Sequence, residues 1–191
     1  MMAEFMKVSY EQFKKDCQKL ESSGALWFAS EEEIRKAYDS IQLPRRATDG
    51  SAGYDFYIPF PASFTTVCPV TFPTGVRVKL GNGTFLMCVP RSGLGFKYGM
   101  RLRNSVGIID EDYFFADNEG HIAAKITCEE PFKLEAGDRF MQGIILPYLT
   151  ATNDNPIEKK RKGGFGSTDG AGQLPGQMSV DDIIYTKENA E

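Results

Sequence analysis

The feature that most constrains this fold is a run of short apolar segments between residues 52 and 148. The clearest are GYDFYIPF, VCPVTF, GVRVKL, TFLMCVP, HIAAKITC and FMQGIILPY, and turn-forming residues separate them. Segments of this composition are typical of strands in a sandwich, jelly roll or barrel. The step Gly81-Asn82-Gly83 indicates a tight hairpin between GVRVKL and TFLMCVP. Because no βαβ alternation or internal repeat is found, the sequence predicts an all-β domain over residues 43–150.

Capping residues predict two short helices before this domain. Ser9 precedes YEQFKKDCQKL and Ser30 precedes EEEIRKAYDS, with Gln12 and Glu33 three positions after the two serines. This pattern is the capping box of a helix N-terminus. It predicts an N-terminal helical extension over residues 1–42, packed on the β domain.

After Tyr148 the composition turns polar and glycine-rich. A segment of this composition buries too little apolar surface to fold by itself. Residues 151–191 are therefore predicted to form a flexible C-terminal arm.

Charge and composition exclude several classes of function. The net charge is -4 and the pI is about 5.2, so no large basic field is available for duplex DNA or RNA, and no nucleic-acid partner is expected. The chain has 1 histidine, His121, which excludes catalysis by several histidines. No apolar run approaches the roughly 18 residues of a membrane span, and no signal-peptide pattern is found at the N-terminus. We expect a cytoplasmic protein without a membrane partner.

The four cysteines predict no zinc site, because none forms a CxxC pair. Each lies in an apolar or helical stretch, which favours reduced, partly buried thiols in a cytosol. They are Cys17, Cys68, Cys88 and Cys128.

Polar and glycine residues gather in five clusters along the second part of the chain. The clusters are AGYD at 52–55, PRSGL at 90–94, NSVGIIDEDY at 104–113, GDRFMQ at 137–142 and KKRKGGFGSTDGAG at 159–172. In the second, an arginine, a hydroxyl and a glycine N–H can converge on phosphate oxygens, although RSG after a strand is more often a turn.

The third cluster allows two interpretations of Asp110. A carboxylate after the apolar pair Ile108-Ile109 is either a turn cap or a general base that activates water. Asn104 can donate to and accept from a base edge, and Tyr113 offers a flat ring for a sugar or base.

Taken in this order, the five clusters resemble the trimeric dUTP diphosphatases (dUTPases), from about residue 43 to residue 170. The resemblance implies a jelly-roll-like β-barrel and a homotrimer whose active sites are shared between subunits. It also implies Mg2+-assisted hydrolysis of dUTP to dUMP and pyrophosphate. FFADNEGHI replaces the family's usual Arg-Gly-Glu after Tyr113, which resembles versions from Gram-positive bacteria and their phages.

The resemblance implies roles for residues of the β domain. Asp110 would hold and deprotonate the water that attacks the α-phosphorus. Asn104 and the backbone at Gly107 would read uracil inside a β-hairpin, and Tyr113 would lie under the deoxyribose and exclude a 2′-hydroxyl. Asp55 would meet Mg2+ through water. The phosphates would be held by Arg91, Ser92, Gly93 and Gln142.

In the arm, the resemblance implies a lid that closes over bound nucleotide. Phe165 would stack on uracil, and Ser167 and Thr168 would donate to phosphates. A lysine stands in the family's usual arginine position, so Arg161 is favoured over Lys160 for the γ-phosphate. The substrate-binding residues of the arm would be Lys160, Arg161, Phe165, Gly166, Ser167 and Thr168.

Two alternatives remain beside this interpretation. dCTP deaminases share the fold, but Lys125 stands where they carry a glutamate base. Phage dUTPases can also act as nucleotide-switched regulatory proteins, and the two terminal extensions leave that role open.

Overall fold

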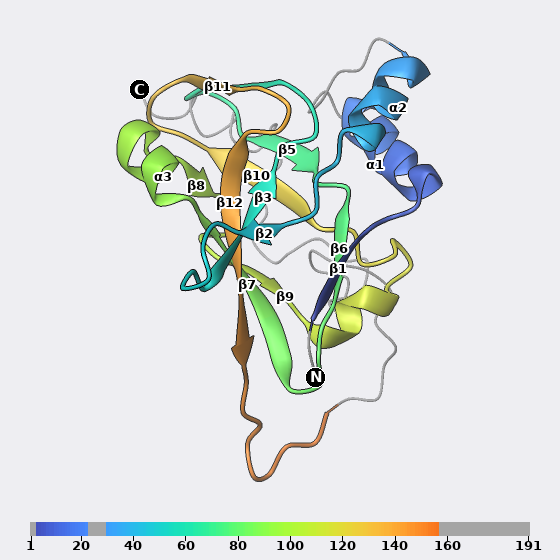
Figure 1. Cartoon of the computed structure of the whole chain (residues 1–191), viewed down its shortest axis with the longest axis vertical. Coiled ribbons are helices and arrows are strands. Elements are labelled where there is room, and N and C mark those ends of the chain that lie inside the picture. The colour runs from blue at the N-terminus through green and yellow to red at the C-terminus, as the bar shows by residue number, and fades with distance from the viewer. Residues whose placement is uncertain (1–2, 23–29, 157–191) are drawn as a thin grey trace, which may run out of the picture.

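The computed structural model describes residues 3–22 and 30–156 (Figure 1). The helices are α1 Tyr10–Ser22, α2 Glu31–Asp39, α3 Ser92–Tyr98 and the 3-10 helix η1 Glu111–Phe115. The strands are β1 Glu4–Lys7, β2 Arg45–Arg46, β3 Gly53–Tyr57, β4 Ala62–Phe64, β5 Val70–Pro73, β6 Val76–Lys79, β7 Thr84–Pro90, β8 Arg101–Leu102, β9 Gly107–Ile109, β10 Ala123–Thr127, β11 Phe132–Leu134 and β12 Arg139–Pro147.

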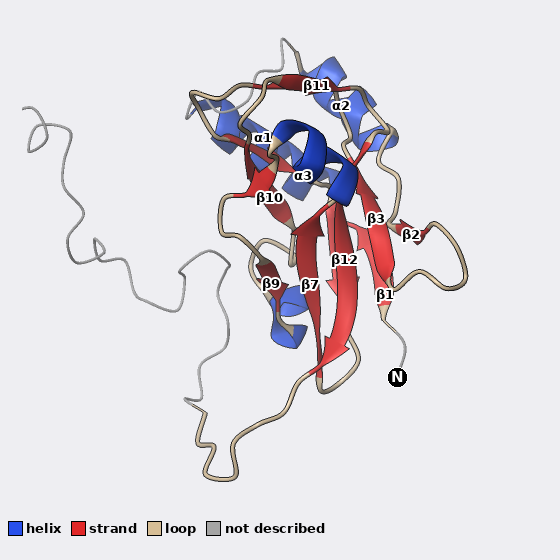
Figure 2. Ribbon diagram, turned by 90° about the vertical axis from the view of Figure 1, so that its left-hand side faces the viewer, coloured by secondary structure: helices blue, strands red, loops and turns tan. Residues whose placement is uncertain are grey.

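The strands pair into four sheets. The largest has the order β2-β3-β12-β7-β9, and its pairs are antiparallel. Smaller sheets are formed by β5-β10-β8, by β1-β6 and by β11-β4. Figure 2 shows β3, β12 and β7 side by side, with α3 across one end of them. The prediction of a mainly β-sheet domain is confirmed. The predicted jelly-roll-like barrel is not, because the pairing of the described strands shows no closed barrel.

The predicted hairpin at Gly81-Asn82-Gly83 is wrong. A turn does form there, closed by a hydrogen bond from the Thr84 N–H to the Gly81 carbonyl, and Gly83 adopts the left-handed φ of +76°. However, β6 pairs with β1, whereas β7 pairs with β12 and β9. The turn therefore passes the chain from one sheet to another, and local turn chemistry cannot reveal that choice of partner.

The two N-terminal helices are confirmed. The Ser30 side chain accepts the Glu33 N–H at the start of α2, and the Ser9 hydroxyl accepts the Gln12 N–H at the start of α1. The second half of the α1 capping box is absent, because Glu119, rather than Gln12, accepts the Ser9 N–H. An unpredicted strand, β1, precedes α1 and pairs with β6.

Helix α3 was not predicted, because its sequence, SGLGFKY, carries two glycines that disfavour helix. It ends at Gly99 in the left-handed conformation. An added Cβ at Gly99 would meet the Glu129 side chain at 2.7 Å, so this turn is closely packed.

One apolar core joins the extension to the sheets. Phe13 and Cys17 of α1 and Ile34 of α2 belong to the same buried cluster as Phe56 and Phe140 of the largest sheet. The extension is thus part of this core, whereas the division of the chain at residues 42 and 150 stays a prediction.

The cysteines follow the prediction with one exception. Cys17, Cys88 and Cys128 are buried thiols. Cys68 is exposed in the loop before β5, because its proline and threonine neighbours do not cover it. None of the described helices is long and apolar enough to cross a bilayer.

Candidate active site

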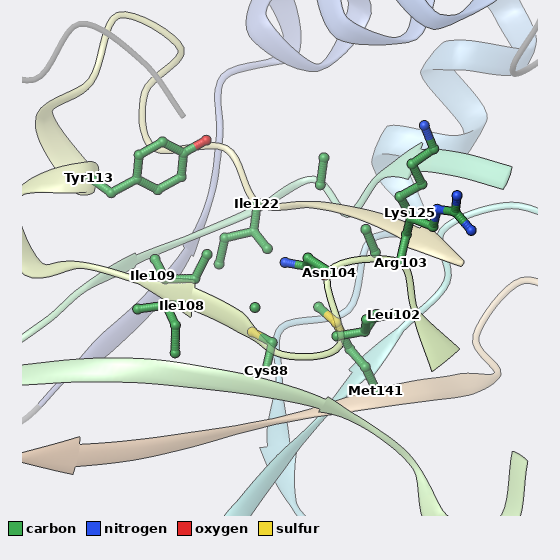
Figure 3. A pocket seen from close by; sticks show the side chains of 13 residues that line it. Cys88, Leu102, Arg103, Asn104, Ile108, Ile109, Tyr113, Ile122, Lys125 and Met141 are labelled. Carbon is green, nitrogen blue, oxygen red and sulfur yellow. The ribbon is translucent and has the colours of Figure 1, made fainter. Parts of the chain in front are cut away.

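A cavity of about 370 Å³ opens between the largest sheet and β10 (Figure 3). It brings together three of the residues proposed from sequence, Asn104, Gly107 and Tyr113. The other lining residues are Cys88, Leu102, Arg103, Ile108, Ile109, Ile122, Ala123, Ala124, Lys125 and Met141. Such a mostly apolar wall with a few polar groups is typical of a small-molecule site.

Asn104 is positioned by the loop between β8 and β9. The Ser105 N–H donates to the Leu102 carbonyl at 2.8 Å, and Ser105 has a left-handed φ of +63°. The Asn104 amide consequently points into the space beside Cys88 (Figure 3). The expected β-hairpin around this loop is not formed in the chain, because β8 pairs with β10 and β9 pairs with β7.

Gly107 is required by its close neighbour. A Cβ at this position would lie 3.1 Å from the Cβ of Cys88 and 3.9 Å from the Nδ2 of Asn104. A larger residue would therefore displace either the Cys88 side chain, which lines the cavity, or the Asn104 amide.

Cys88 contributes an apolar surface rather than a nucleophile. Burial raises the pKa of its thiol to about 12, so the neutral thiol is the stable form at neutral pH. Because Met141 lies beside it in the cavity wall, this side of the cavity suits the face of a planar ring.

Tyr113 closes the opposite side of the cavity (Figure 3). It lies in η1 with an exposed fraction of 3%. Its hydroxyl donates to the His121 carbonyl at 2.9 Å and accepts from Asn118 Nδ2 at 2.8 Å. The ring is therefore held in one orientation, with its hydroxyl engaged by the loop that follows η1.

Asp110 lies between β9 and η1, beside the cavity but outside its wall. It lines a neighbouring hollow together with Phe85, Glu111, Asp112 and Tyr148. Ile108 lines both the cavity and this hollow. Glu111 has a structural bond, since it accepts the Gly83 N–H at 2.9 Å.

A second group of proposed residues lies on β3, at the start of α3 and on β12. Asp55 is buried and forms ion pairs with Arg91 Nε through Oδ1 and with Arg139 Nη1 through Oδ2, each at 3.1 Å. The Arg139 contact is also a hydrogen bond, whereas the Arg91 Nε contact lacks hydrogen-bond geometry. Arg139 was missed, although it lies inside the GDRFMQ cluster, where an arginine next to Gln142 was the available signal.

Gln142 and Gly53 are coupled across β12 and β3. An added Cβ at Gly53 would lie 2.6 Å from the Gln142 Oε1, so the glycine makes room for the amide. Ser92 and Gly93 begin α3 directly after Arg91, and an added Cβ at Gly93 would meet nothing within 4 Å. The backbone at Gly93 is therefore open to an approaching group.

The two groups are far apart within one chain. Asp55 on β3 and the segment β9–Asp110 are separated by β12 and β7, three strand spacings or about 14 Å. The proposed arm residues 160–168 lie outside the described residues.

The fold and site define the chain as a mainly β-sheet protein with a cavity of about 370 Å³, an acidic turn beside it and a separate arginine–carboxylate cluster. The family model for dUTPase matches residues 39–169. The deoxyuridine 5'-triphosphate nucleotidohydrolase of Lactococcus lactis subsp. lactis is 40% identical over 132 residues, which cover 67% of this chain and 88% of that protein. The chain belongs to the dUTPase family.

Solved structures agree with this assignment. The crystal structure of dUTPase from Streptococcus mutans superposes with a TM-score of 0.54 at 36% identity, covering 60% of this chain and 91% of that one. A variant dUTPase from phage phi11 of S. aureus, described with a structural Mg(II) ion, gives a TM-score of 0.52 at 17% identity, covering 63% and 92%. The latter likeness concerns the fold alone.

Proposed function

We propose that the protein hydrolyses dUTP to dUMP and pyrophosphate. The observation that carries this proposal is the arrangement around Ile108, which lines both the nucleoside-sized cavity and the hollow that holds Asp110. A base bound in the cavity would put its 5′ substituent near that carboxylate.

In this proposal the cavity binds deoxyuridine. Asn104 and the backbone at Gly107 hydrogen-bond the uracil edge, and Cys88 and Met141 contact the ring face. Tyr113 lies against the deoxyribose, where its fixed ring leaves no room for a 2′-hydroxyl.

Asp110 acts as the general base. It accepts a proton from a water molecule while the water oxygen bonds to the α-phosphorus. The bond from that phosphorus to the oxygen bridging to the β-phosphate then breaks, and pyrophosphate leaves with the electron pair. No covalent intermediate is needed, since the residues only position the water and compensate charge.

The triphosphate is held by the second group of residues. Arg91, Ser92, Gly93 and Gln142 offer a guanidinium, a hydroxyl, an open backbone and an amide. When Arg91 turns to a phosphate, it releases Oδ1 of Asp55, which still has Arg139 as a partner. From the arm, we propose Lys160, Arg161, Phe165, Gly166, Ser167 and Thr168 as the lid residues on the family resemblance alone.

Mg2+ is proposed to enter with the triphosphate. Within the described residues no group of three or more histidine, cysteine or acidic side chains could hold a metal by itself. This fits a Mg2+ ion held by phosphates and one carboxylate. Asp55, once released by Arg91, would hold a water of that ion, and the bound ion would neutralise phosphate charge.

The separation of the two groups supports shared sites in a homotrimer. One triphosphate is too short to reach both Asp110 and Asp55 of the same chain across about 14 Å of sheet. We propose that a neighbouring subunit supplies the phosphate-binding group. We also propose a jelly-roll-like closure, on the resemblance alone, and a cytoplasmic location, on the reduced cysteines expected from the sequence.

The cavity lining argues against dCTP deamination. Among the described residues that line it there is no carboxylate, and the lining includes Lys125, which by the family resemblance stands where the deaminases carry their glutamate base. A deaminating water would therefore lack its general base.

A pyrophosphate-release assay with dUTP, dCTP, dTTP and UTP, each with and without Mg2+, tests the proposal. We expect dUTP to be hydrolysed and the other three to react far more slowly, because Asn104 and Tyr113 select base and sugar. Ammonia release from dCTP, or equal rates with dUTP and dTTP, would contradict the proposal.

A further inference from the structure

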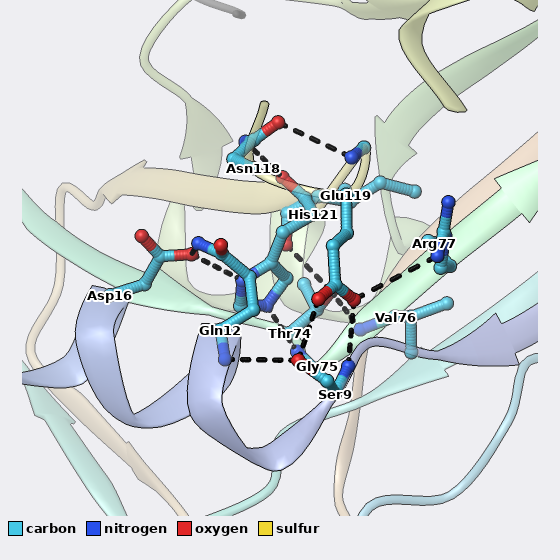
Figure 4. A network of polar contacts seen from close by, with 12 residues as sticks. Ser9, Gln12, Asp16, Thr74, Gly75, Val76, Arg77, Asn118, Glu119 and His121 are labelled. Atoms are coloured by element: carbon cyan, nitrogen blue, oxygen red, sulfur yellow. Dashed lines mark hydrogen bonds and ion pairs between the residues drawn. The ribbon is translucent and has the colours of Figure 1, made fainter. Parts of the chain in front are cut away.

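The N-terminal extension is linked to the loop 116–122 by a polar network that is centred on the buried His121 and reaches the surface at Ser9 (Figure 4). His121 has an exposed fraction of 2%, and both of its ring nitrogens are engaged. The Gly75 N–H donates to Nε2 at 2.8 Å, so Nε2 is the acceptor of the ring. Nδ1 therefore carries the proton and donates it to Asp16 Oδ2 of α1 at 2.6 Å. Gln12, one turn earlier on α1, also donates to Asp16 Oδ2, at 2.8 Å.

His121 also holds Tyr113, which forms the wall of the cavity on the side proposed for the sugar. The His121 carbonyl accepts the Tyr113 hydroxyl at 2.9 Å, while the His121 ring is fixed by Asp16. A displacement of the His121 ring would move its carbonyl and hence the acceptor of Tyr113. Ile122, the next residue, lines the cavity directly.

The loop is closely packed over Tyr113 in an unfavourable backbone conformation. Glu119 and Gly120 have successive left-handed φ values of +58° and +70°. An added Cβ at Gly120 would lie 2.6 Å from the Tyr113 carbonyl oxygen. A non-glycine residue such as Glu119 adopts this conformation only where its surroundings hold it there.

Ser9, at the start of α1, supplies that restraint. Its N–H donates to Glu119 Oε2 at 2.8 Å, and its hydroxyl donates to Glu119 Oε1 at 2.6 Å. The two bonds occupy both carboxylate oxygens of Glu119, which also lies 3.8 Å from Arg77 Nη1.

A third link runs through β1 and β6. Met6 of β1 pairs with Arg77 of β6, and Arg77 stacks on the Phe114 ring at 3.8 Å. Arg77 also donates to the Phe114 carbonyl at 2.7 Å. Phe114 follows Tyr113 in η1, so the extension supports the turn itself as well as the loop after it.

We propose that Ser9 and Asp16 are positioning residues of the active site, which act through Glu119 and His121 to fix Tyr113. The consequence is that the N-terminal extension sets how well the enzyme rejects a 2′-hydroxyl. This inference rests on the proposed function, because it needs the nucleoside to bind beside Tyr113.

The test compares kcat/KM for dUTP and for UTP in the full-length protein. Asp16→Ala removes the acceptor of His121, and we expect the dUTP/UTP preference to fall about tenfold, since a small misplacement of a contact group costs factors of this size. Asp16→Asn keeps an oxygen that can accept the Nδ1 proton, so it should retain most of the preference. The gain in UTP turnover should come through a lower KM for UTP.

Ser9→Asp provides a second variant at an exposed position, where folding is not at risk. Aspartate still caps α1 by accepting the Gln12 N–H, but its charge repels Glu119 and breaks the link. We expect the same loss of preference as with Asp16→Ala.

Two matched controls separate positioning from general destabilisation. Lys14→Ala removes the surface ion pair of α1 with Glu31 and should leave the preference unchanged. Ile34→Ala opens a cavity in the shared core and should lower Tm without changing the preference.

The outcomes distinguish this inference from the proposed function. A parent protein that fails to hydrolyse dUTP would overturn the proposed function and this inference with it. A parent that hydrolyses dUTP, with a preference kept within twofold in both Asp16→Ala and Ser9→Asp, would overturn the positioning role alone. A preference that falls equally in Ile34→Ala would also overturn it.

Discussion

Mixed trimers of two inactive variants should recover activity. Asp110→Asn removes the proposed base, and Arg91→Ala removes a phosphate ligand. Neither change should prevent folding, because Asp110 lies on a surface turn and Asp55 keeps Arg139 as a partner when Arg91 is lost. Each variant alone should lose at least about 100-fold in kcat.

The expected recovery follows from the separation of the two groups. If a site takes Asp110 from one chain and Arg91 from another, it is intact only in one arrangement. The chain that supplies Asp110 must be the Arg91→Ala variant, and the chain that supplies Arg91 must be the Asp110→Asn variant. In random trimers made from equal amounts of both chains, each requirement is met half of the time. About one quarter of the parental activity should therefore return.

The assay is pyrophosphate release after the two variants are unfolded together and refolded. Different affinity tags on the two chains establish that mixed trimers have formed. A mixture of Asp110→Asn with Asp110→Ala serves as the control and should stay inactive. Proven mixed trimers of Asp110→Asn and Arg91→Ala without recovery would refute the shared site and the distance reasoning behind it.

Three further predictions concern single variants. Asp110→Asn should still bind a non-hydrolysable dUTP analogue, as measured by calorimetry, because the carboxylate acts on water. A kcat within tenfold of the parent would show that Asp110 is not the base. Phe13→Ala, at a fully buried position of α1, should lower the free energy of urea unfolding by about 3–5 kcal/mol, and a loss below about 1 kcal/mol would show that the extension does not share the core. Burial raises the pKa of Asp16, but hydrogen bonds from His121 and Gln12 outweigh it and leave the pKa below its ordinary value of 3.8. Asp16 therefore stabilises the fold above that value, and its contribution is lost as the pH falls through the lower folded-state pKa. Between pH 7 and pH 3, Tm should consequently fall less in Asp16→Asn than in the parent. Glu119 is present in both proteins, so its protonation does not contribute to the difference. Equal falls in Tm would contradict this prediction.

The local part of the fold was predictable from sequence. Strands such as β7 and β12 follow from β-branched and aromatic residues between turn residues, and α2 follows from Ser30 and Glu33. These signals act between residues a few positions apart. The order of the five clusters likewise indicates the family without any tertiary contact.

Pairing and packing were decided only by the tertiary structure. Turn residues at 81–83 cannot specify that β6 joins β1 while β7 joins β12, because strand partners are selected by distant side chains. For the same reason, β8 and β9 flank the Asn104 loop without pairing with each other.

The site shows the same division. Its candidate residues could be named from their chemistry, and Asn104, Gly107 and Tyr113 do line one cavity. The sequence could not show that Asp55 is paired with Arg139 of β12 and with Arg91 at the start of α3.

The link between Ser9 and Glu119 joins residues 110 positions apart, and no local pattern contains it. The sequence by itself determined which side chains were available and which strands and helices formed. The tertiary structure decided which of those side chains meet, because that depends on the packing of a single core shared by the extension and the sheets.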